Sequence, residues 1–328
     1  MKAFVKIGTL SAFSLLMALI FACSGGGGGG GGTAGGAGIT YTGSTAQATI
    51  DATNSQNLSA EAYKGGAFGT SASLGTVQKT VAERPNYLDL ALTVEEAIHQ
   101  INLYALPGVV EAGAVVTASD TIAGGCGGTA QYAIQYDNVT GDFTGTLSFA
   151  IFCSEGVTLS GSASCSGKVD VNTGNFIQLA LSINNFTVAS GSVSYTVQGS
   201  ITYSYQVTSV TVAMTMLLLD NTTGKVFWIN PYDMTLSQGS NYVDFQVSGR
   251  FYHPDYGYVD ISTPTAFRIY SGSTWPSQGL LMLDGKTGIA GGSTRARLTV
   301  ISSNAYEVEA DTNGDGTYEW NSGSLSWQ

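Results

Sequence analysis

The stretch CGGTAQYAIQYDNVTGDFTGTLSFAIFC, residues 126–153, contains a β-hairpin signal. Two alternating runs, 129–137 and 142–153, flank Asn138-Val139-Thr140-Gly141, and Asn and Gly are typical of hairpin loops. If Asp137 faces Asp142, then Tyr136 faces Phe143 and Ala130 faces Phe149. A shift of one residue would scatter this apolar face. The pattern therefore predicts one antiparallel register.

The same register predicts a disulfide. It places Cys126 opposite Cys153, and directly opposed strand residues have the Cα spacing that a disulfide needs. The alternative is a pair of reduced core thiols, because cysteine pairs are oxidised only outside the cytosol. Cys165 is then left over, and we expect a buried small hydrophobe on the apolar face.

The amino terminus indicates export. Lys2 and Lys6 precede an apolar segment that ends at residue 22, and this arrangement predicts a signal peptide over residues 1–22. The end of this segment, Leu19-Ile20-Phe21-Ala22, together with Cys23-Ser24, resembles the lipobox of bacterial lipoproteins, although Phe21 fits the pattern poorly. The resemblance implies cleavage before Cys23 and its lipidation. Residues 23–38 are then a Gly-rich tether, and Ser24 favours the outer membrane. The alternative is a soluble exported protein.

Composition limits the possible partners. The chain has 328 residues and a formal net charge of −11, with 11% charged residues. So few basic residues disfavour binding to nucleic acid or anionic lipid head groups. Abundant Ser, Thr, Gly and Tyr are typical of an exported β protein.

Residues 39–107 form a small mixed α/β segment in this interpretation. A strand-like piece over 39–50 precedes a capping box at Thr53-Asn54-Ser55-Gln56, which predicts a helix ending near Lys64-Gly65-Gly66. A second capping box at residues 93–96 predicts a helix over 94–105, which Pro107-Gly108 ends.

Residues 108–328 are predicted to form an antiparallel β domain with about thirteen strands. Residues 258–263 and 266–269 are expected to be two different strands. The fold class is mainly β: a long antiparallel meander forming a curved or barrel-like sheet, with a small N-terminal helical segment. So many sequential strands with one apolar face must curl, close or fold into two layers. A two-sheet sandwich is the second choice and a membrane-spanning barrel the third.

Motifs for catalysis are weak, so no catalytic residue is assigned. The sequence has no Gly-x-Ser-x-Gly elbow, zinc motif or phosphate loop, and its two histidines are His99 and His253. Residues 251–258 group His253 with aromatic residues, which we interpret as a Pro-Asp turn between two strands. The four tryptophans are interpreted as sheet core and strand-end packing rather than as sugar platforms.

The organisation of the chain resembles that of bacterial lipoproteins of uncharacterised function. The resemblance rests on the lipobox, the polyglycine tether, the long β domain and an aspartate-rich turn. It implies a lipid-anchored cell-envelope protein. The absence of a catalytic constellation then favours a non-enzymatic binding or structural role, with a protein, a glycan or an apolar ligand as partner. Alternatives are a carrier of apolar ligands in a curled sheet and an exported hydrolase.

The aspartate-rich turn near the C-terminus is a candidate calcium site. Residues 311–319, DTNGDGTYE, place oxygen-bearing side chains at the spacing with which a tight loop wraps calcium. The turn resembles EF-hand loops, which implies these ligands: Asp311, Asn313, Asp315, the carbonyl of Thr317, and Glu319. Position twelve is Ser322 rather than glutamate, so any affinity should be weak. The alternative is a polar hairpin turn whose acids face water.

Overall fold

Antiparallel strands dominate the computed structural model, which describes residues 38–70, 115–154, 156–173, 175–190, 193–271, 273 and 275–327. The predicted signal peptide, Cys23 with its tether up to residue 37, and the predicted helix over 94–105 lie outside the described residues. Gly38–Gln328 form one compact unit.

The described residues form one helix and a 15-stranded sheet. Their bounds, in chain order, are α1 Ser55–Thr70, β1 Val115–Ala123, β2 Gly127–Asp137, β3 Asp142–Ser154, β4 Val157–Val169, β5 Phe176–Ser190, β6 Val193–Tyr205, β7 Ser209–Asp220, β8 Val226–Gln238, β9 Tyr242–His253, β10 Gly257–Tyr270, β11 Gln278–Thr287, β12 Ser293–Ser302, β13 Ala305–Asp311, β14 Trp320–Asn321 and β15 Leu325–Ser326.

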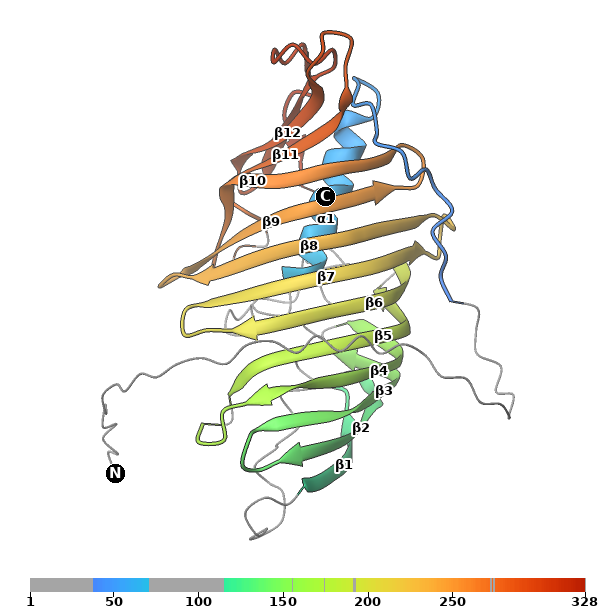
Figure 1. The fold of residues 1–328 in the computed structure, drawn as a ribbon, viewed down its shortest axis with the longest axis vertical. Helices are drawn as coiled ribbons and strands as arrows, with labels where there is room; N and C mark the ends of the chain where they lie inside the picture. Colours follow the sequence, from blue (N-terminus) through green and yellow to red (C-terminus); the bar gives the residue numbers. More distant parts are fainter. Residues whose placement is uncertain are drawn as a thin grey trace. The chain divides into compact units, whose positions relative to one another are not determined.

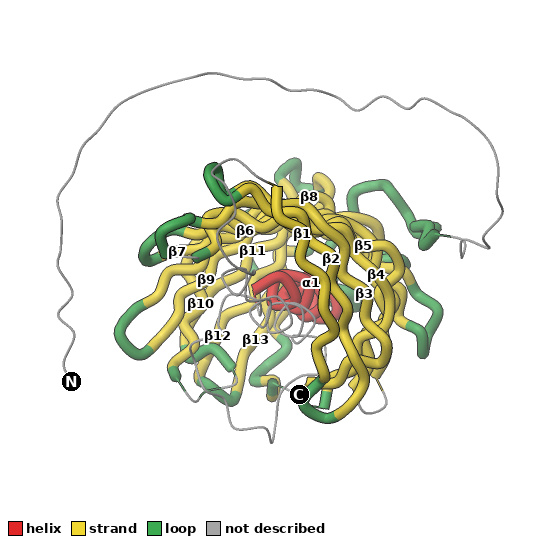
Figure 2. The backbone as a smooth tube through the Cα atoms, turned by 90° about the horizontal axis from the view of Figure 1, so that it is seen from below, coloured by secondary structure: helices red, strands yellow, loops and turns green. Residues whose placement is uncertain are grey.

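The sheet is an antiparallel meander in which strands pair in the order of the chain from β1 to β14 (Figure 1). The short strand β15 pairs with β13. Among the described strands β1 pairs only with β2, so the sheet is not closed. Figure 2 shows it curving around α1. The predicted fold, a curved antiparallel meander with a small N-terminal helix, is confirmed.

The predicted register of the first hairpin is confirmed over most of its length. Tyr136 pairs with Phe143, and the same register continues to Thr129 and Ala150. It then shifts by one residue, so that Gly127 rather than Cys126 pairs with Cys153. Ile151 has a φ of 51° here, the mark of a β-bulge that alternation alone does not predict.

Bulges and glycines bend the sheet. Register shifts interrupt most neighbouring strand pairs, for example between Ile183 and Phe186 in β5. Gly161, Gly199 and Gly249 lie within strands and have φ values of 132°, 150° and 138°. A Cβ at Gly199 would lie 2.1 Å from the Thr215 carbonyl oxygen, so a side chain there would push β6 and β7 apart. Bulges and interior glycines are the usual means by which a sheet acquires curvature.

Strand β10 corrects one prediction. Residues 258–263 and 266–269, expected as two strands, belong to one strand, Gly257–Tyr270. Pro264 lies at the register shift between Ser262 and Thr265, where β10 faces β11. Proline lacks the N–H that a ladder needs, and a bulge accommodates it without ending the strand.

The N-terminus of α1 is capped two residues earlier than predicted. The Asp51 carboxylate accepts hydrogen bonds from the N–H groups of Thr53 (2.7 Å) and Asn54 (3.0 Å). In return, Asn54 Oδ1 accepts the Asp51 N–H at 3.0 Å. This reciprocal pair is a capping box at residues 51–54, so the one predicted at Thr53–Gln56 is wrong. The hydrogen bonds lower the pKa of Asp51, although its partial desolvation opposes them.

The C-terminal half of α1 also differs from the prediction. The helix continues through Gly65 and Gly66 to Thr70 instead of ending there. A Cβ at Gly65 would lie 3.2 Å from Ile229 Cδ1, and one at Gly66 would lie 3.3 Å from Val247 Cγ1. These glycines therefore allow close approach of helix to sheet, a role that a sequence pattern cannot distinguish from a helix stop.

The core lies on the inner face of the sheet, and α1 packs on the part of this face that is formed by the later strands. The main contacts of α1 are with β7, β8, β9, β11, β12 and β13. Tyr63 of α1 packs against Phe267 and Trp327, with ring centroids 5.0 Å apart in both cases. Trp327 also lies 4.3 Å from Tyr306, so the C-terminal segment contributes to the core beside α1.

Residues 38–50 cross the ends of several strands. They were expected as a strand, but they form only one isolated bridge, between Gln47 and Tyr258. Ile39 N–H donates to Gln198 Oε1 of β6 at 2.7 Å, and Lys286 N–H donates to the Ala48 carbonyl at 2.7 Å. This segment therefore connects β6 to β11 before the chain enters α1.

Candidate functional site

The acidic loop, residues 311–319, follows β13 and is organised by Asp311. Asp311 is 1% exposed, and its carboxylate accepts the N–H groups of Gly314 (2.7 Å), Asp315 (3.3 Å) and Gly316 (2.8 Å). Gly314 and Gly316 have φ values of 81° and 90°, a conformation that glycine adopts without strain. Asp311 therefore acts as the internal hydrogen-bond acceptor that folds the loop.

Three carboxylates converge in the acidic loop. Asp311, Asp315 and Glu319 each offer an oxygen, and these oxygens lie within 4.8 Å of one another. Thr312 holds Glu319 over the loop, because its N–H donates to Glu319 Oε2 at 2.9 Å. Asp315 and Glu319 are exposed while Asp311 is buried. This group can hold a metal ion.

Asn313 lies among these carboxylates but presents its amide nitrogen to them. Its Nδ2 donates to Asp315 Oδ2 at 3.2 Å and to Glu319 Oε1. Its Oδ1 accepts the Asp315 N–H at 2.8 Å. The amide hydrogens of Asn313 thus lie between the carboxylates of Asp315 and Glu319, in the place that a cation would take. To be a ligand, Asn313 would have to turn its amide oxygen toward them.

Thr317 and Ser322, the two remaining positions of the predicted calcium loop, make hydrogen bonds within the loop and to the sheet. Thr317 N–H donates to Asp315 Oδ1 at 2.7 Å, and this bond, with the contribution of Asn313, lowers the pKa of Asp315. Ser322, at position twelve, is bound to β13: its Oγ accepts the Val308 N–H at 2.9 Å. Ser322 is therefore engaged by the sheet edge.

The β11–β12 turn supports the acidic loop. Ala290 N–H donates to the Asn313 carbonyl at 2.9 Å, and Gly292 N–H donates to the Gly314 carbonyl at 3.1 Å. A Cβ at Gly288 would lie 2.2 Å from the Asn313 carbonyl oxygen, so the two turns approach closely because this residue is glycine. The nearby Arg295, which faces Asp311 across β12 and β13, is ion-paired with Asp284 at 2.7 Å.

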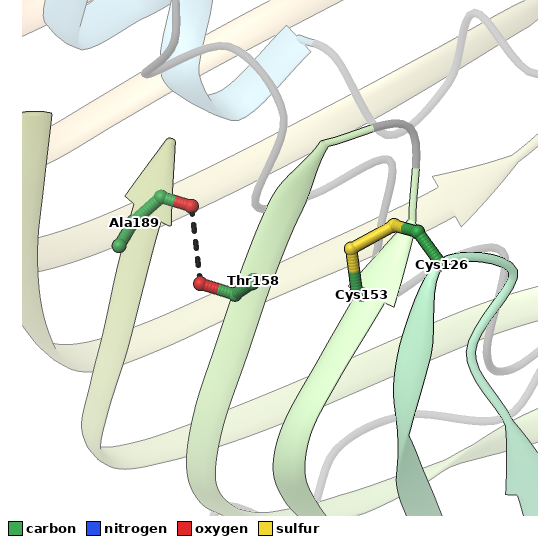
Figure 3. The surroundings of a disulfide bond; sticks show 4 residues. All are labelled: Cys126, Cys153, Thr158 and Ala189. Carbon is green, nitrogen blue, oxygen red and sulfur yellow. Dashed lines mark hydrogen bonds between the residues drawn. A yellow bond between two sulfur atoms is a disulfide. The ribbon is translucent and has the colours of Figure 1, made fainter. Parts of the chain in front are cut away.

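The predicted disulfide is confirmed. Cys126 and Cys153 are bonded, with their Cα atoms 5.1 Å apart (Figure 3). The bulge moves Cys126 out of the ladder, but its N–H donates to the Cys153 carbonyl at 3.2 Å and keeps the two residues adjacent. Next along the sheet, Thr158 Oγ1 donates to the Ala189 carbonyl at 3.2 Å. Cys165 is free and buried, as predicted, and burial raises its pKa to about 11.

His253 is the last residue of β9, directly before the predicted turn. It is 5% exposed, its ring stacks on Tyr256 at 4.4 Å, and its Nδ1 accepts the Asp255 N–H at 3.1 Å. Burial lowers the pKa of His253 to about 4. The interpretation as a Pro-Asp turn with packed aromatic edges is confirmed. His99 and Cys23 lie outside the described residues.

One constellation on the outer sheet face was missed at the sequence level. Arg268 pairs with Asp244 at 2.7 Å and covers the Tyr242 ring, its guanidinium carbon 3.8 Å from the centroid. Arg250 repeats the arrangement with Asp260 (2.7 Å) and Tyr258 (4.0 Å). The repeated Tyr-Val-Asp of 242–244 and 258–260 was the available signal. These groups join β9 to β10.

Comparison with known proteins gives no assignment: no family model, curated protein or solved structure matches the chain. In the part of the chain that the structure describes, no helix has both the length and the apolar character needed to cross a membrane.

Proposed function

We propose that this protein is a lipid-anchored component of the bacterial cell envelope with a non-enzymatic binding or structural role, and that its acidic loop binds calcium. The convergence of Asp311, Asp315 and Glu319 within 4.8 Å is the observation that carries the proposal. The disulfide supports the extracytoplasmic address, because disulfides persist in oxidising compartments.

Calcium suits the chemistry of the loop. It prefers several oxygen ligands in a flexible arrangement, and carboxylates, amide oxygens and backbone carbonyls all serve. The loop has three carboxylates and, after rotation of the Asn313 amide, one amide oxygen; the Thr317 carbonyl and water would complete the shell. Asp315 and Glu319 are exposed, so binding requires little desolvation and should be weak. We expect a Kd of ~10⁻⁴–10⁻³ M, as in extracellular calcium modules.

The test is thermal unfolding with and without calcium. At 10 mM calcium this range of Kd predicts a gain of ~1.4–2.7 kcal/mol in unfolding free energy. Asp315→Asn and Glu319→Gln should abolish the gain, because they remove charge while preserving shape. Asp311 is unsuitable for this test because its carboxylate holds the loop together without a metal.

The matched control is Asp233→Asn, an exposed carboxylate on β8 outside the loop, which should retain the full response. Magnesium at equal ionic strength should give a smaller response, because it demands closer octahedral geometry. An unchanged melting temperature in calcium would show that the acidic loop is only a turn.

The lipid anchor has its own test. Metabolic labelling with a fatty acid should modify the chain, and Cys23→Ser should abolish the label. Protease treatment of intact cells then distinguishes a surface-facing domain, which favours adhesion, from a periplasmic one.

Beside α1, the described residues of the inner face offer little room for an apolar ligand. The helix α1 occupies this face over β7–β9 and β11–β13. Beside it, a cavity lined by residues that include Lys64, Leu218 and Phe251 has a volume of about 30 Å³. A dry cavity that holds benzene is about 150 Å³, so this one is too small for a ring or an acyl chain. Extraction and mass spectrometry of the purified protein test the carrier alternative directly, because a carrier should retain lipid and a binding or structural protein should not.

A further inference from the structure

The turns at one end of the C-terminal strands carry no charge. In an antiparallel meander every second turn lies at the same end of the strands, so the turns after β6, β8, β10 and β12 share one end of the sheet (Figure 1). The matching turns of the N-terminal strands are flanked by Asp137, Asp142 and Asp170 and are not included. We call the uncharged end the four turns that contain no Asp, Glu, Lys or Arg, namely residues 206–208, 239–241, 271–277 and 303–304.

Apolar side chains project at the uncharged end. Val207, in the middle of the turn after β6, is 102% exposed. Ile301, near the end of β12, is 50% exposed, and Tyr270, the last residue of β10, is 38% exposed. Single apolar residues scattered over a surface need no explanation. These residues instead gather where charged side chains are missing, which indicates a contact surface.

Aromatic rings lie close behind these projecting side chains. Tyr242, the first residue of β9, packs edge-on against Tyr270, with ring centroids 5.9 Å apart. Trp275, in the turn after β10, is half-buried and stacks on Trp327 at 5.1 Å. Tyrosine and tryptophan have an apolar body and a polar edge, so they are enriched where a protein meets the boundary between lipid and water.

The opposite ends of the same strands are charged. Lys225, in the turn after β7, is ion-paired at 2.6 Å with Asp255, in the turn after β9. The acidic loop, with Asp315 and Glu319, follows β13 at this charged end. The C-terminal strands therefore separate an end suited to water from an end suited to an apolar boundary.

We propose that the uncharged end docks on the surface of a lipid bilayer with zwitterionic head groups. Val207 and Ile301 enter the boundary between head groups and acyl chains, and Tyr270 lies at the level of the head groups. Separate projecting side chains would need matching hollows on a folded protein partner, whereas a bilayer yields to them. The four turns contain no Lys or Arg and the chain has a formal net charge of −11, so anionic lipid is disfavoured.

Vesicle flotation tests this contact without the proposed lipid anchor. The chain used starts at residue 23 and carries Cys23→Ser, so it cannot be lipidated there, and it keeps the compact unit Gly38–Gln328. It should float with phosphatidylcholine vesicles and float less when phosphatidylglycerol is added. Val207→Asp should lower the partition coefficient about tenfold or more, because a charge replaces an apolar side chain that enters the bilayer. Failure here leaves the anchor and the calcium loop untouched, because each has its own test.

Ile289→Asp is the matched control. Ile289 is 98% exposed in the turn after β11, at the charged end, and its replacement adds the same charge as Val207→Asp. It should leave the partition coefficient unchanged, whereas Ile301→Asp should act in the same direction as Val207→Asp. Both turn positions project into water, so these variants should fold, and circular dichroism with thermal unfolding checks this.

An environment-sensitive label shows which end meets the bilayer. Cys165 is buried and Cys126 is bonded to Cys153, so a cysteine introduced at position 207 or 289 is the accessible thiol of the described residues. A nitrobenzoxadiazole label on Val207→Cys should brighten and shift to the blue when vesicles are added. The same label on Ile289→Cys should not change.

Four outcomes would overturn the proposal. The first is that the folded chain does not float at high lipid concentration. The second is flotation that requires phosphatidylglycerol. The third is an equal loss of flotation in Val207→Asp and Ile289→Asp, which would mean that added charge alone controls association. The fourth is a blue shift at position 207 that appears without vesicles and grows with protein concentration, which would show that a second copy of the chain covers this end.

Discussion

Removal of the Cys126–Cys153 disulfide tests how the N-terminal hairpin is stabilised. The bond joins residues with a sequence separation of 27, and both lie at exposed or half-buried positions beside a bulge. Replacement by serine therefore removes few packing contacts, and the main effect is on the unfolded chain. The loop-entropy relation gives ~12 cal/mol/K for this length, or about 3.5 kcal/mol at 25 °C. That is a large share of the ~5–15 kcal/mol by which typical domains are stable.

The assay is urea unfolding of the oxidised native chain against Cys126→Ser with Cys153→Ser. For a slope near 3 kcal/mol/M the midpoint should fall by about 1 M, and the slope should rise because the unfolded chain is freer to expand. Reductant should lower the midpoint of the native chain to that of the double variant. With Cys23→Ser in both proteins, it should leave the double variant unchanged, because Cys165 is then the one remaining thiol and cannot form an internal disulfide.

A loss below about 1 kcal/mol would refute this reasoning, since it would mean that the unfolded chain is already constrained in this region. An equal effect of reductant on the double-serine variant would refute it differently, because the effect would then come from another thiol.

Three further predictions follow from the core and the turns. Trp327→Ala should lower the unfolding free energy by about 3 kcal/mol, because the indole fills the space between Tyr63, Tyr306 and Trp275. Denaturant titration measures this loss, and Val207→Ala, at an exposed position, is a control that should be nearly neutral. His253 is neutral when folded and its pKa is lowered to about 4, so the unfolded state binds the extra proton and stability should fall between pH 6.5 and pH 4, by up to about 3 kcal/mol. His253→Phe should flatten the dependence of unfolding free energy on pH between pH 6.5 and pH 4. The charged neighbours Asp255 and Lys225 remain in both proteins, so an unaltered pH dependence would mean that groups other than His253 cause it. Gly66→Leu should destabilise by ~1–3 kcal/mol because a Cβ at this position would lie 3.3 Å from Val247 Cγ1, so the rest of the side chain has no room. An unchanged melting temperature would show that α1 can shift on the sheet.

The alternation of apolar residues was sufficient to predict the meander, because a period of two with one buried face leaves few other arrangements. It also predicted the pairing of Tyr136 with Phe143, since any shift would have exposed Phe149. Strand β1 was not recognised, and β10 was divided at Pro264. In both strands the alternation of apolar residues is interrupted while the hydrogen-bonded ladder continues. In β1 the reason is weak burial at the edge of the sheet, and in β10 it is the bulge at Pro264.

The local chemistry of loops was harder to predict than the sheet. The acids of residues 311–319 could be identified from their spacing, and the structure brings three of them together. That Asn313 turns its amide nitrogen toward them could not be predicted, because the orientation of an amide depends on the donors and acceptors around it, which residue spacing does not give. The helix cap at Asp51 was missed because several Asx and Thr residues compete as caps within a few positions, and only the geometry of the chain distinguishes them.

The order of the strands has a consequence for how the protein forms. Every long strand pairs with its neighbours in the chain, so the sheet can grow hairpin by hairpin with little loop closure at each step. The helix α1 is different, because it precedes all the described strands in the chain yet packs against strands from β7 to β13. Its Tyr63 can make its contact with Trp327 only after the C-terminal end of the chain has been made. A chain emerging from its N-terminus therefore carries an uncovered helix until the last strands arrive, and the final assembly of the core should coincide with the release of the C-terminus.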